Sequence, residues 1–281
     1  MPELVEVETT RRDLSKLIIN KRIEKVDVYL DKIVYNKAAE FIKKVQGSII
    51  LDVKRRGKWL LFELDKSYLV IHFRMEGRFY YQPKDAKKDK HDYVIFYFND
   101  ASLHYNDPRL FGKMEIIEKD KIEDFFKDRK LGLEYTDINL TSSYLKKRFK
   151  SHHTDIKKML LDQSFITGIG NIYADEILFR SGINPKCYAD KLSTSKLDLI
   201  IKNTKEVFEE ALKYKGTYPN IDGKRGTYEQ HLLVHMRKGL ECFKCKTIIV
   251  KEKVGGRGTY YCPMCQKNEK RNIIKWYKKH G

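Results

Sequence analysis

The spacing of apolar residues changes along the chain and divides it into regions of different secondary structure. Close to the N-terminus, apolar positions recur at helical spacing and predict an amphipathic helix over residues 3–19. From about residue 22 to 117, short apolar runs are punctuated by Gly, Asp, Asn and Pro, which is typical of strands. Helical spacing returns over 121–216, and a loop follows over 215–230. The apolar positions of the first helix are Leu4, Val7, Leu14, Leu17 and Ile18.

Individual elements can be placed within these regions. Closely spaced strands favour a β-sandwich or a barrel. The pattern therefore predicts an α+β protein, β-rich at first and helical afterwards. The predicted strands cover 23–30, 49–53, 59–64, 68–73, 93–98, 102–105 and 113–117. The predicted helices between and after them cover 38–45, 121–128, 141–150, 155–163, 171–181 and 193–214.

Charge narrows the range of partners. The 281 residues include 57 Lys and Arg against 39 Asp and Glu, a net charge of 57 − 39 = +18. Such an excess favours a polyanionic partner, above all DNA or RNA. The hydrophobic fraction of 41% is too high for a disordered chain, and apolar runs such as 59–62 are too short to span a membrane. The acidic N-terminus does not resemble a signal peptide, so we expect a cytoplasmic protein.

Four of the five cysteines form two C-x-x-C pairs with 16 residues between them. In a chain without a signal peptide, this spacing predicts one tetrahedral Zn²⁺ site, with free or redox-active thiols as the alternative. Four thiolates leave no open coordination position, so the ion would be structural. A strand over 247–254, a turn over 255–258 with Arg257 at its tip, and a return strand over 259–261 predict a β-hairpin zinc finger. The predicted ligands are Cys242, Cys245, Cys262 and Cys265.

Pro2 could make the N-terminus of the chain a nucleophile. Removal of Met1 would leave a secondary α-amine, and α-amines have a pKa of about 7.7–8, against about 10.4 for lysine. An unprotonated amine attacks an aldehyde carbon to form an iminium ion, and Glu3 could be its acid partner. The same two residues also make an ordinary helix start, because proline is favoured in the first turn and a carboxylate suits the positive helix end.

Six motifs occur in one order along the chain, and in combination they closely resemble the bacterial formamidopyrimidine-DNA glycosylases over about residues 2–266. The resemblance implies an N-terminal β-sandwich, a helical domain with a helix–two-turn–helix, and a zinc finger. It also implies base excision repair by a bifunctional DNA glycosylase and abasic-site lyase. The motifs are PELVEVET at 2–9, RGKWLL at 56–61, KHD at 90–92, DPRLFG at 107–112, GIGNIYA at 168–174 and the zinc finger.

The resemblance implies catalytic roles for four residues, and helical spacing adds Glu6 in a supporting role. Pro2 would attack C1′ of the damaged nucleotide, and Glu3 would be the general acid/base at the sugar. Glu6, one helical turn later, would support the active site or form a structural salt bridge. Lys58 would contact the lesion phosphate and donate a proton in β-elimination, and Arg257 would bind phosphate and act in δ-elimination. The alternatives for the last two are a basic strand edge and an ordinary surface charge.

A second group of residues would contact the duplex after the damaged base has left the stack. A base must leave the stack before C1′ can be attacked. By resemblance, Met75 fills the void, Phe111 wedges the opposite strand and Arg109 pairs with the orphaned base, which favours guanine-derived lesions opposite cytosine. Core packing and an ordinary turn are the alternatives for these residues.

Further residues are matched to DNA contacts. By resemblance, His91, His152 and Asn171 contact DNA, and Asn171 can also cap a helix. Lys157 matches a family lysine near the lesion, with a surface charge as the alternative. The segment 216–223 is shorter than the family loop that closes over 8-oxoguanine, so formamidopyrimidines, hydantoins or oxidised pyrimidines could be the better substrates.

These expectations define four domains and a partner. The domains are a catalytic β-sandwich over 1–130, a helical DNA-binding domain over 131–236, a zinc finger over 237–267 and a basic tail over 268–281. The expected partner is damaged double-stranded DNA, without a membrane, and the expected state is a monomer. An endonuclease VIII-like enzyme for oxidised pyrimidines and a non-catalytic zinc-dependent DNA-binding protein are the alternative functions.

Overall fold

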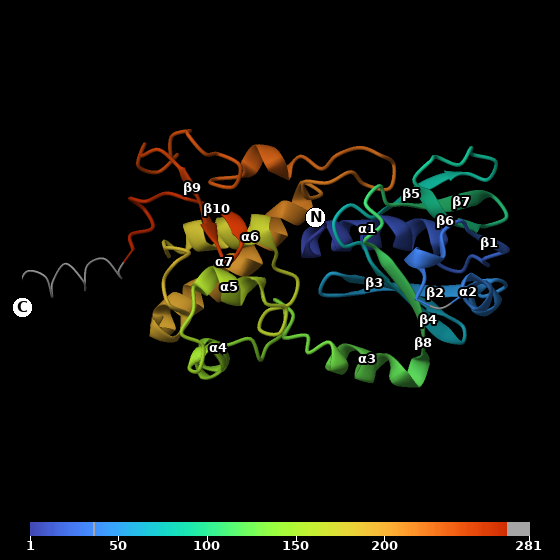
Figure 1. The fold of residues 1–281 in the computed structure, drawn as a ribbon, viewed down its shortest axis with the longest axis horizontal. Coiled ribbons are helices and arrows are strands. Elements are labelled where there is room, and N and C mark those ends of the chain that lie inside the picture. The colour runs from blue at the N-terminus through green and yellow to red at the C-terminus, as the bar shows by residue number, and fades with distance from the viewer. Residues whose placement is uncertain (36, 269–281) are drawn as a thin grey trace, which may run out of the picture. The chain divides into compact units, whose positions relative to one another are not determined.

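The computed structural model describes residues 1–35 and 37–268 (Figure 1). The chain divides into two compact units, and each is described by itself. The first unit holds Met1–Lys130 together with Ala211–Tyr228, and the second holds Leu131–Glu210 together with the chain from Glu229 onward. From position 269 on, the predicted basic tail lies outside the described residues.

Two four-stranded antiparallel sheets form the core of the first unit, with strand orders β2-β3-β4-β8 and β1-β6-β7-β5. Side chains from both sheets meet in one apolar core, where the rings of Phe62 and Phe79 stack at 5.8 Å. The predicted β-sandwich is therefore confirmed. The strands are β1 (Lys25–Val28), β2 (Ile50–Arg56), β3 (Trp59–Leu64), β4 (Ser67–His72), β5 (Arg78–Pro83), β6 (Asp92–Tyr97), β7 (Ala101–Asn106) and β8 (Lys113–Glu118).

Strand β5 was missing from the sequence prediction. Its residues, Arg-Phe-Tyr-Tyr-Gln-Pro, show no clear alternation of apolar and polar side chains, and only Phe79 is fully buried. The strand is held instead by its ladder with β7, which runs from Arg78 opposite Asn106 to Pro83 opposite Ala101. Backbone pairing, which leaves no periodic signal in the side chains, thus decides its conformation.

Helices cover parts of this sandwich. Helix α1 buries Val7, Leu14 and Ile18 in the core, as its periodicity predicted. On α1, Glu8 binds Arg11 and Arg12, and these hydrogen bonds outweigh the effect of burial and lower the pKa of Glu8 to about 2. The helices of this unit are α1 (Leu4–Ile18), α2 (Ala38–Val45) and α3 (Ile122–Asp128), with short 3₁₀ turns at Asp31–Ile33 (η1) and Lys119–Lys121 (η2).

The second unit is helical and carries a hairpin near its end. Helix α6 lies in the interior, with Tyr173, Ala174, Ile177 and Leu178 fully buried. None of the described helices is long and apolar enough to cross a membrane. The elements are α4 (Ser142–Phe149), α5 (Ile156–Leu161), α6 (Asn171–Arg180), α7 (Thr194–Lys213, which ends in the first unit), β9 (Val250–Val254) and β10 (Arg257–Tyr261), with 3₁₀ turns at Ala189–Lys191 (η3) and Tyr228–His231 (η4).

The segment 211–228 falls inside the predicted helical domain but belongs with the sandwich. It leaves the end of α7 and folds back on itself, since Gly226 N donates to Tyr218 O (3.0 Å) and Tyr228 N donates to Gly216 O (3.0 Å). Ile221 at its far end is buried in the sandwich core. This segment brings residues from late in the sequence to the N-terminus of the chain.

Candidate active site

Pro2 is buried just before helix α1, where two glutamates fix the backbone. Glu3 is 1% exposed, and its backbone N–H donates to Glu6 Oε2 at 2.9 Å. The other oxygen of Glu6 accepts from the backbone N–H (3.1 Å) and the hydroxyl (3.3 Å) of Thr217. Glu6 therefore ties the start of α1 to the segment 211–228.

A small cavity opens beside Pro2. It holds about 10 Å³, enough for about one water molecule. The Met1 amine donates a hydrogen bond to the Tyr218 hydroxyl. Met1 therefore occupies space next to Pro2, and its removal would both expose a secondary amine and enlarge the room beside it. The cavity, here called the Pro2 cavity, is lined by Pro2, Glu6, Thr10, Phe73, Gly77, Arg78, Lys215, Tyr218, Pro219 and Asn220.

Four charged side chains act on the N-terminal amine. Burial lowers the pKa of the Met1 amine, and this effect outweighs the opposing influence of Glu3, Glu6 and Glu76. Lys58 lowers the pKa further; it lies in the β2–β3 turn and is only 8% exposed. The structure thus places Glu3, Glu6 and Lys58 near the amine that precedes Pro2. Glu76 was missed, because nothing in its own neighbourhood links it to the N-terminus.

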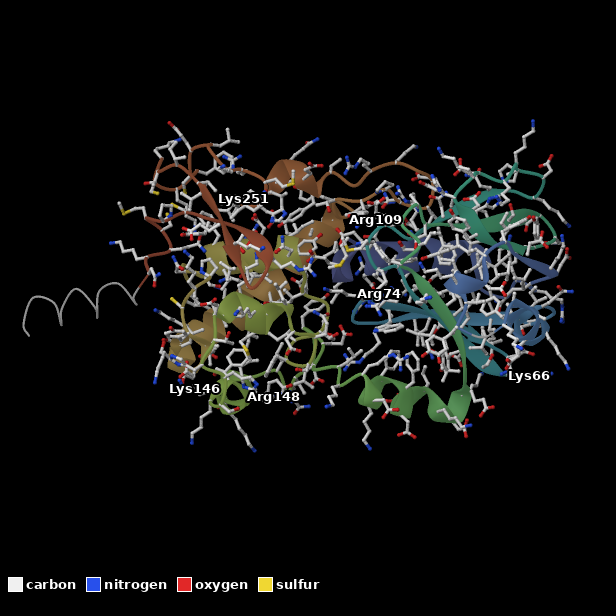
Figure 2. All side chains as sticks on the ribbon, viewed as in Figure 1. Lys66, Arg74, Arg109, Lys146, Arg148 and Lys251 are labelled. Carbon is white, nitrogen blue, oxygen red and sulfur yellow. The ribbon has the colours of Figure 1, made fainter. Side chains whose placement is uncertain are left out.

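Two loops carry the residues expected to handle the opened duplex. Met75 is half-buried in the β4–β5 turn, while Arg109 and Phe111 are exposed in the β7–β8 loop, which Figure 2 marks at Arg109. The Arg109 guanidinium lies over the Phe111 ring, 5.2 Å from its centroid. Its Nη1 lies 3.9 Å from Oε1 of Glu76, the residue that follows Met75. The two loops are therefore neighbours.

Buried side chains beneath these loops fix their shape. The carboxylate of Asp107 accepts from Arg109 N (3.2 Å) and Gly112 N (2.7 Å), which folds the β7–β8 loop back on itself. The Tyr105 hydroxyl lies against two glycines. A Cβ atom would come within 2.3 Å of it at Gly77 and within 1.6 Å at Gly112. Burial raises the pKa of Tyr105 well above its usual value, so the hydroxyl stays protonated.

His91, another predicted DNA contact, lies next to the same loop. It immediately precedes β6, and its carbonyl accepts from Asp107 N at 3.0 Å. Its own N–H donates to Asp89 Oδ1 at 2.9 Å. The backbone N–H and carbonyl of His91 are therefore both hydrogen-bonded, which fixes the position of the residue while its imidazole stays partly exposed.

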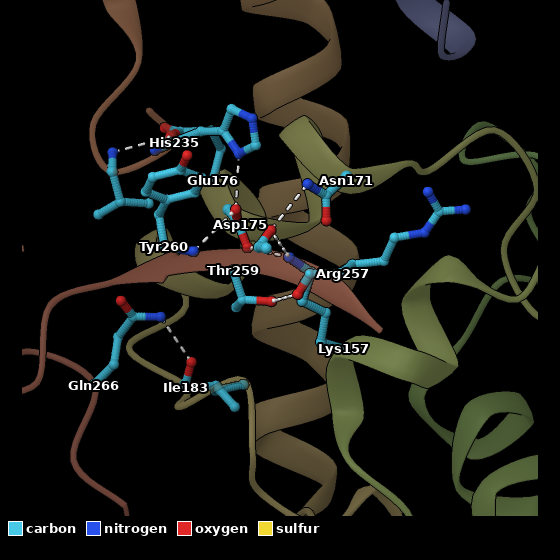
Figure 3. Close-up of polar contacts among 12 residues, drawn as sticks. Lys157, Asn171, Asp175, Glu176, Ile183, His235, Arg257, Thr259, Tyr260 and Gln266 are labelled. Atoms are coloured by element: carbon cyan, nitrogen blue, oxygen red, sulfur yellow. Dashed lines mark hydrogen bonds and ion pairs between the residues drawn. The ribbon is translucent and has the colours of Figure 1, made fainter. Parts of the chain in front are cut away.

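Lys157 belongs to a buried network in the second unit (Figure 3). The side chain is 0% exposed, which excludes the surface-charge alternative. Its ammonium lies 2.6 Å from Asp175 Oδ1. The other oxygen of Asp175 accepts from Tyr260 N (3.2 Å) and contacts His235 Nδ1 (2.7 Å). Helices α5 and α6 are thereby joined to strand β10.

Asn171 connects to the same strand. It is the first residue of α6, and its Nδ2 donates to Gly258 O at 3.0 Å. Lys157 Nζ donates to the same carbonyl at 3.4 Å. Both residues therefore hold the backbone directly after Arg257.

Arg257 was predicted at the tip of the hairpin, but it lies one residue after the turn. Gly255 and Gly256, with φ of 57° and 80°, form the turn by themselves, because left-handed backbone at both positions closes a two-residue hairpin. Arg257 is the first residue of β10 and pairs with Val254. Figure 3 shows its side chain pointing away from the Lys157–Asp175 network.

His152 lies apart from this network, in the exposed stretch after α4. Its ring packs edge-on against Phe165, with 5.3 Å between centroids, and its Nδ1 is 3.0 Å from Arg148 O. The imidazole is held at the surface of the second unit by a ring on one side and a carbonyl on the other.

Comparison with known proteins matches all three parts of the chain. Residues 1–114 match the formamidopyrimidine-DNA glycosylase N-terminal domain, residues 131–221 the H2TH domain of the same enzymes, and residues 239–268 the zinc finger found in FPG and IleRS. The formamidopyrimidine-DNA glycosylase of Carboxydothermus hydrogenoformans is 39% identical and that of Bacillus cereus 42%, each over 273 residues. These alignments cover 95% of this chain and 99–100% of the relatives.

The chain belongs to the formamidopyrimidine-DNA glycosylase family. Solved structures of Lactococcus lactis Fpg agree with this assignment. The complex with abasic-site DNA superimposes with a TM-score of 0.91 at 34% identity, covering 95% of this chain and all of that one. The resemblance seen in the sequence and the α+β multidomain fold are confirmed. The chain is thus a DNA glycosylase of the base excision repair class, in a family that also has lyase activity.

The family's zinc finger is matched by a suitable set of ligands. The four Sγ atoms of the predicted cysteines lie within 4.8 Å of one another. Three of the separations are 3.4, 3.4 and 3.8 Å, near the roughly 3.8 Å between thiolates that bind one tetrahedral Zn²⁺ at about 2.3 Å. Cys242 and Cys262 are fully buried. The site fits one structural zinc ion, as predicted.

Proposed function

We propose that this chain removes oxidised bases from duplex DNA and cleaves the resulting abasic site, with the Pro2 amine as the nucleophile. The observation that carries this proposal is the buried N-terminus. A cavity, the carboxylates of Glu3 and Glu6 at the start of α1, and the buried cation of Lys58 all adjoin it. Burial favours the unprotonated, nucleophilic form of an amine in this place.

The proposed reaction assigns one task to each charged residue. Pro2 attacks C1′, the base departs, and an iminium ion links the chain to the sugar. Glu3 exchanges protons at the sugar oxygen, and Glu6 keeps α1 and the segment 211–228 in register. Lys58 binds the lesion phosphate and donates a proton in β-elimination. Arg257 binds phosphate and completes δ-elimination.

DNA binding uses the loops of the first unit and the surface of the second. Met75 fills the space of the everted nucleotide, Phe111 wedges the opposite strand, and Arg109 faces the orphaned base. The contact of Arg109 with Phe111 supports a joint action on that strand. His91, His152 and Asn171 contact the backbone, while Lys157 acts from the interior by holding β10 and therefore Arg257.

Purine-derived lesions opposite cytosine are the proposed substrates, with formamidopyrimidines ahead of 8-oxoguanine because the segment 216–223 is short. Lactococcus lactis Fpg has been solved with Fapy-dG and with oxidised-pyrimidine DNA, which supports a range of lesions in this fold. We further propose a cytoplasmic monomer, since a single lesion requires a single active site. The four predicted domains remain part of this proposal, with the segment 211–228 counted with the sandwich.

Borohydride trapping tests the proposal. Purified protein is mixed with duplexes that carry a preformed abasic site, a formamidopyrimidine, 8-oxoguanine opposite C, a hydantoin or dihydrouracil. We expect a covalent complex on the abasic duplex, because the iminium ion is reduced to a stable bond. Among the base lesions we expect formamidopyrimidine to lead. Preference for dihydrouracil would instead support the endonuclease VIII-like alternative.

The nucleophile is tested by Pro2→Gly and by a chemically blocked N-terminus. Both are expected to abolish trapping while binding to duplex DNA persists. Mass spectrometry of the wild type must show that Met1 has been removed. Trapping that continues unchanged in either form would assign the nucleophile to another amine.

A further inference from the structure

The Pro2 cavity is completed by a hairpin from late in the chain. Tyr218, Pro219 and Asn220 line it, more than 200 positions after Pro2. The hairpin closes on itself, because Asn220 N donates to Lys224 O (2.8 Å) and Gly223 N donates to Asn220 O (3.0 Å). Although the segment is short, it is an ordered wall of the cavity.

This hairpin is attached to the sandwich at both ends. At its base, Thr217 donates twice to Glu6, and Gly216 has no room for a side chain, because a Cβ atom would lie 2.6 Å from Glu6 Oε1. At its tip, Ile221 is buried in the core and its carbonyl accepts from Tyr81 N at 3.0 Å. Tyr218 lies between these attachments, so its position is set by the fold.

The Tyr218 hydroxyl reaches the atoms next to the nucleophile. It accepts a hydrogen bond from the Met1 amine, whose nitrogen stands one residue before the Pro2 nitrogen. Met1 is absent from an enzyme that uses Pro2, so the Met1 atoms mark space that becomes free at the nucleophile. A nucleotide bonded to Pro2 must place its sugar in that space.

We propose that Tyr218 is a further catalytic residue, which hydrogen-bonds the deoxyribose while it is attached to Pro2. The inference rests on the proposed function. When Pro2 forms its bond to C1′, the base leaves with the electron pair of its glycosidic bond and takes up the amine proton. The C1′–O4′ bond then breaks, its electron pair moves to O4′, and the nitrogen lone pair forms the C=N⁺ bond. Tyr218 donates a hydrogen bond to O4′ as its negative charge develops, and Glu3 supplies the proton.

Three neighbouring features agree with this role. The carboxylate of Glu6 is occupied by Thr217 and the Glu3 backbone, so it holds the hairpin in place. The hydroxyl of Tyr218 is both donor and acceptor, which suits a sugar oxygen that changes from ether to hydroxyl. A hydrogen bond aimed at developing charge in a small, largely enclosed cavity strengthens in the transition state and therefore acts on rate more than on affinity.

The matched test compares Tyr218→Phe with Tyr214→Phe. Tyr214 lies on the same segment, is 36% exposed and does not line the Pro2 cavity. The rate of borohydride trapping is measured at saturating abasic duplex. Affinity is measured separately on a duplex with a tetrahydrofuran at the abasic position, which cannot open. We expect Tyr218→Phe to trap about tenfold more slowly with unchanged affinity, as one hydrogen bond removed from the transition state predicts. Tyr214→Phe is expected to match the wild type.

The outcomes separate the inference from the proposed function. Wild-type protein with a free Pro2 that fails to trap would overturn both. Wild-type trapping together with an equally fast Tyr218→Phe variant would overturn only the role of Tyr218. A variant whose slower trapping is fully explained by weaker tetrahydrofuran binding or a lower unfolding midpoint would show that Tyr218 acts in packing, which also contradicts the inference.

Discussion

At the scale of single residues, the clearest electrostatic effect is on His72, which ends strand β4. Burial, followed by the positive charges of Arg74 and Lys58, lowers the pKa of His72 to about 3. Its Nδ1 accepts a hydrogen bond from Arg74 N at 3.0 Å, which requires that nitrogen to be unprotonated. His72 therefore remains neutral at physiological pH and adds no second cation beside Lys58.

This neutral histidine predicts an acid-sensitive fold. The unfolded chain binds a proton at His72 below pH 6.5, whereas the folded protein does so only below about 3. Its contribution to stability is therefore complete above pH 6.5 and is lost as the pH falls towards 3. His72→Asn keeps an acceptor and cannot titrate. Denaturant unfolding at pH 7 and pH 4.5 should show a smaller pH-dependent loss in this variant; equal losses in both proteins would contradict the assigned pKa.

Residues that carry chemistry were easier to predict than residues that position them. The cysteines are recognisable from their spacing and Pro2 and Glu3 from their reactive groups at the N-terminus, whereas Lys58 was assigned from the family resemblance alone. Tyr218 does not, because its only distinction is a place in the fold reached after more than 200 residues. Asp175 was missed for a related reason, since a carboxylate on a helix resembles a surface charge until its burial beside Lys157 is known.

At the scale of elements, the β4–β5 turn and the β7–β8 loop depend on one tyrosine beneath them. The hydroxyl of Tyr105 fills the space that a side chain at Gly77 or Gly112 would need. Asp107 completes the arrangement by bonding the β7–β8 loop backbone. Tyr105 and Asp107 therefore fix the separation between Met75 and the Arg109–Phe111 pair.

Gly112→Ala tests this dependence. The new methyl group would lie 1.6 Å from the Tyr105 hydroxyl, so the loop must shift. We expect a destabilisation of about 1–3 kcal/mol, typical of overpacking, and a weaker preference for cytosine opposite the lesion. Tyr105→Phe removes the clashing oxygen and should restore part of both losses in the double variant. Strictly additive effects of the two changes would show that these residues do not interact.

Secondary structure was predictable for elements that bury one face, and less predictable for elements held by pairing with another strand. The position of α1 and the bounds of α2 were predicted from the spacing of apolar residues. Strand β5 required knowledge of its partner β7, and strand β10 begins at Arg257, two residues before the predicted return strand, because two glycines suffice for the turn. Pairing across strands is a non-local property that one strand's sequence does not contain.

At the scale of the whole molecule, the zinc finger is joined firmly to the helical unit. Gln266 donates to Ile183 O (2.9 Å) and accepts from Cys262 N (2.9 Å), while Asn184 donates to its carbonyl (2.8 Å). Figure 3 shows the Gln266–Ile183 contact below the Lys157–Asp175 network. The metal site therefore supports the strand that presents Arg257.

Zinc removal should consequently impair DNA binding. A chelator is expected to lower affinity for an abasic duplex at least about tenfold, because the hairpin folds around the metal. The dependence of affinity on salt should also weaken, with the log–log slope smaller by about 1 for each phosphate that the protein no longer neutralises. Affinity is measured in titrations at several salt concentrations, with re-added zinc as the control. Unchanged affinity and slope after verified metal removal would exclude the finger from the DNA interface.

The path of the chain has a consequence for how such an enzyme can be divided. The backbone passes between the units after Lys130, again after Glu210 and again after Tyr228. A break anywhere within 131–210 therefore leaves Pro2 and Tyr218 on different fragments, although both line one cavity. A recombination event that transferred only the codons of residues 1–130 would transfer Pro2 without Tyr218, which lines the cavity beside it. An exchangeable module that keeps both sides of the cavity must therefore extend at least from Pro2 to Tyr228, and not stop at residue 130.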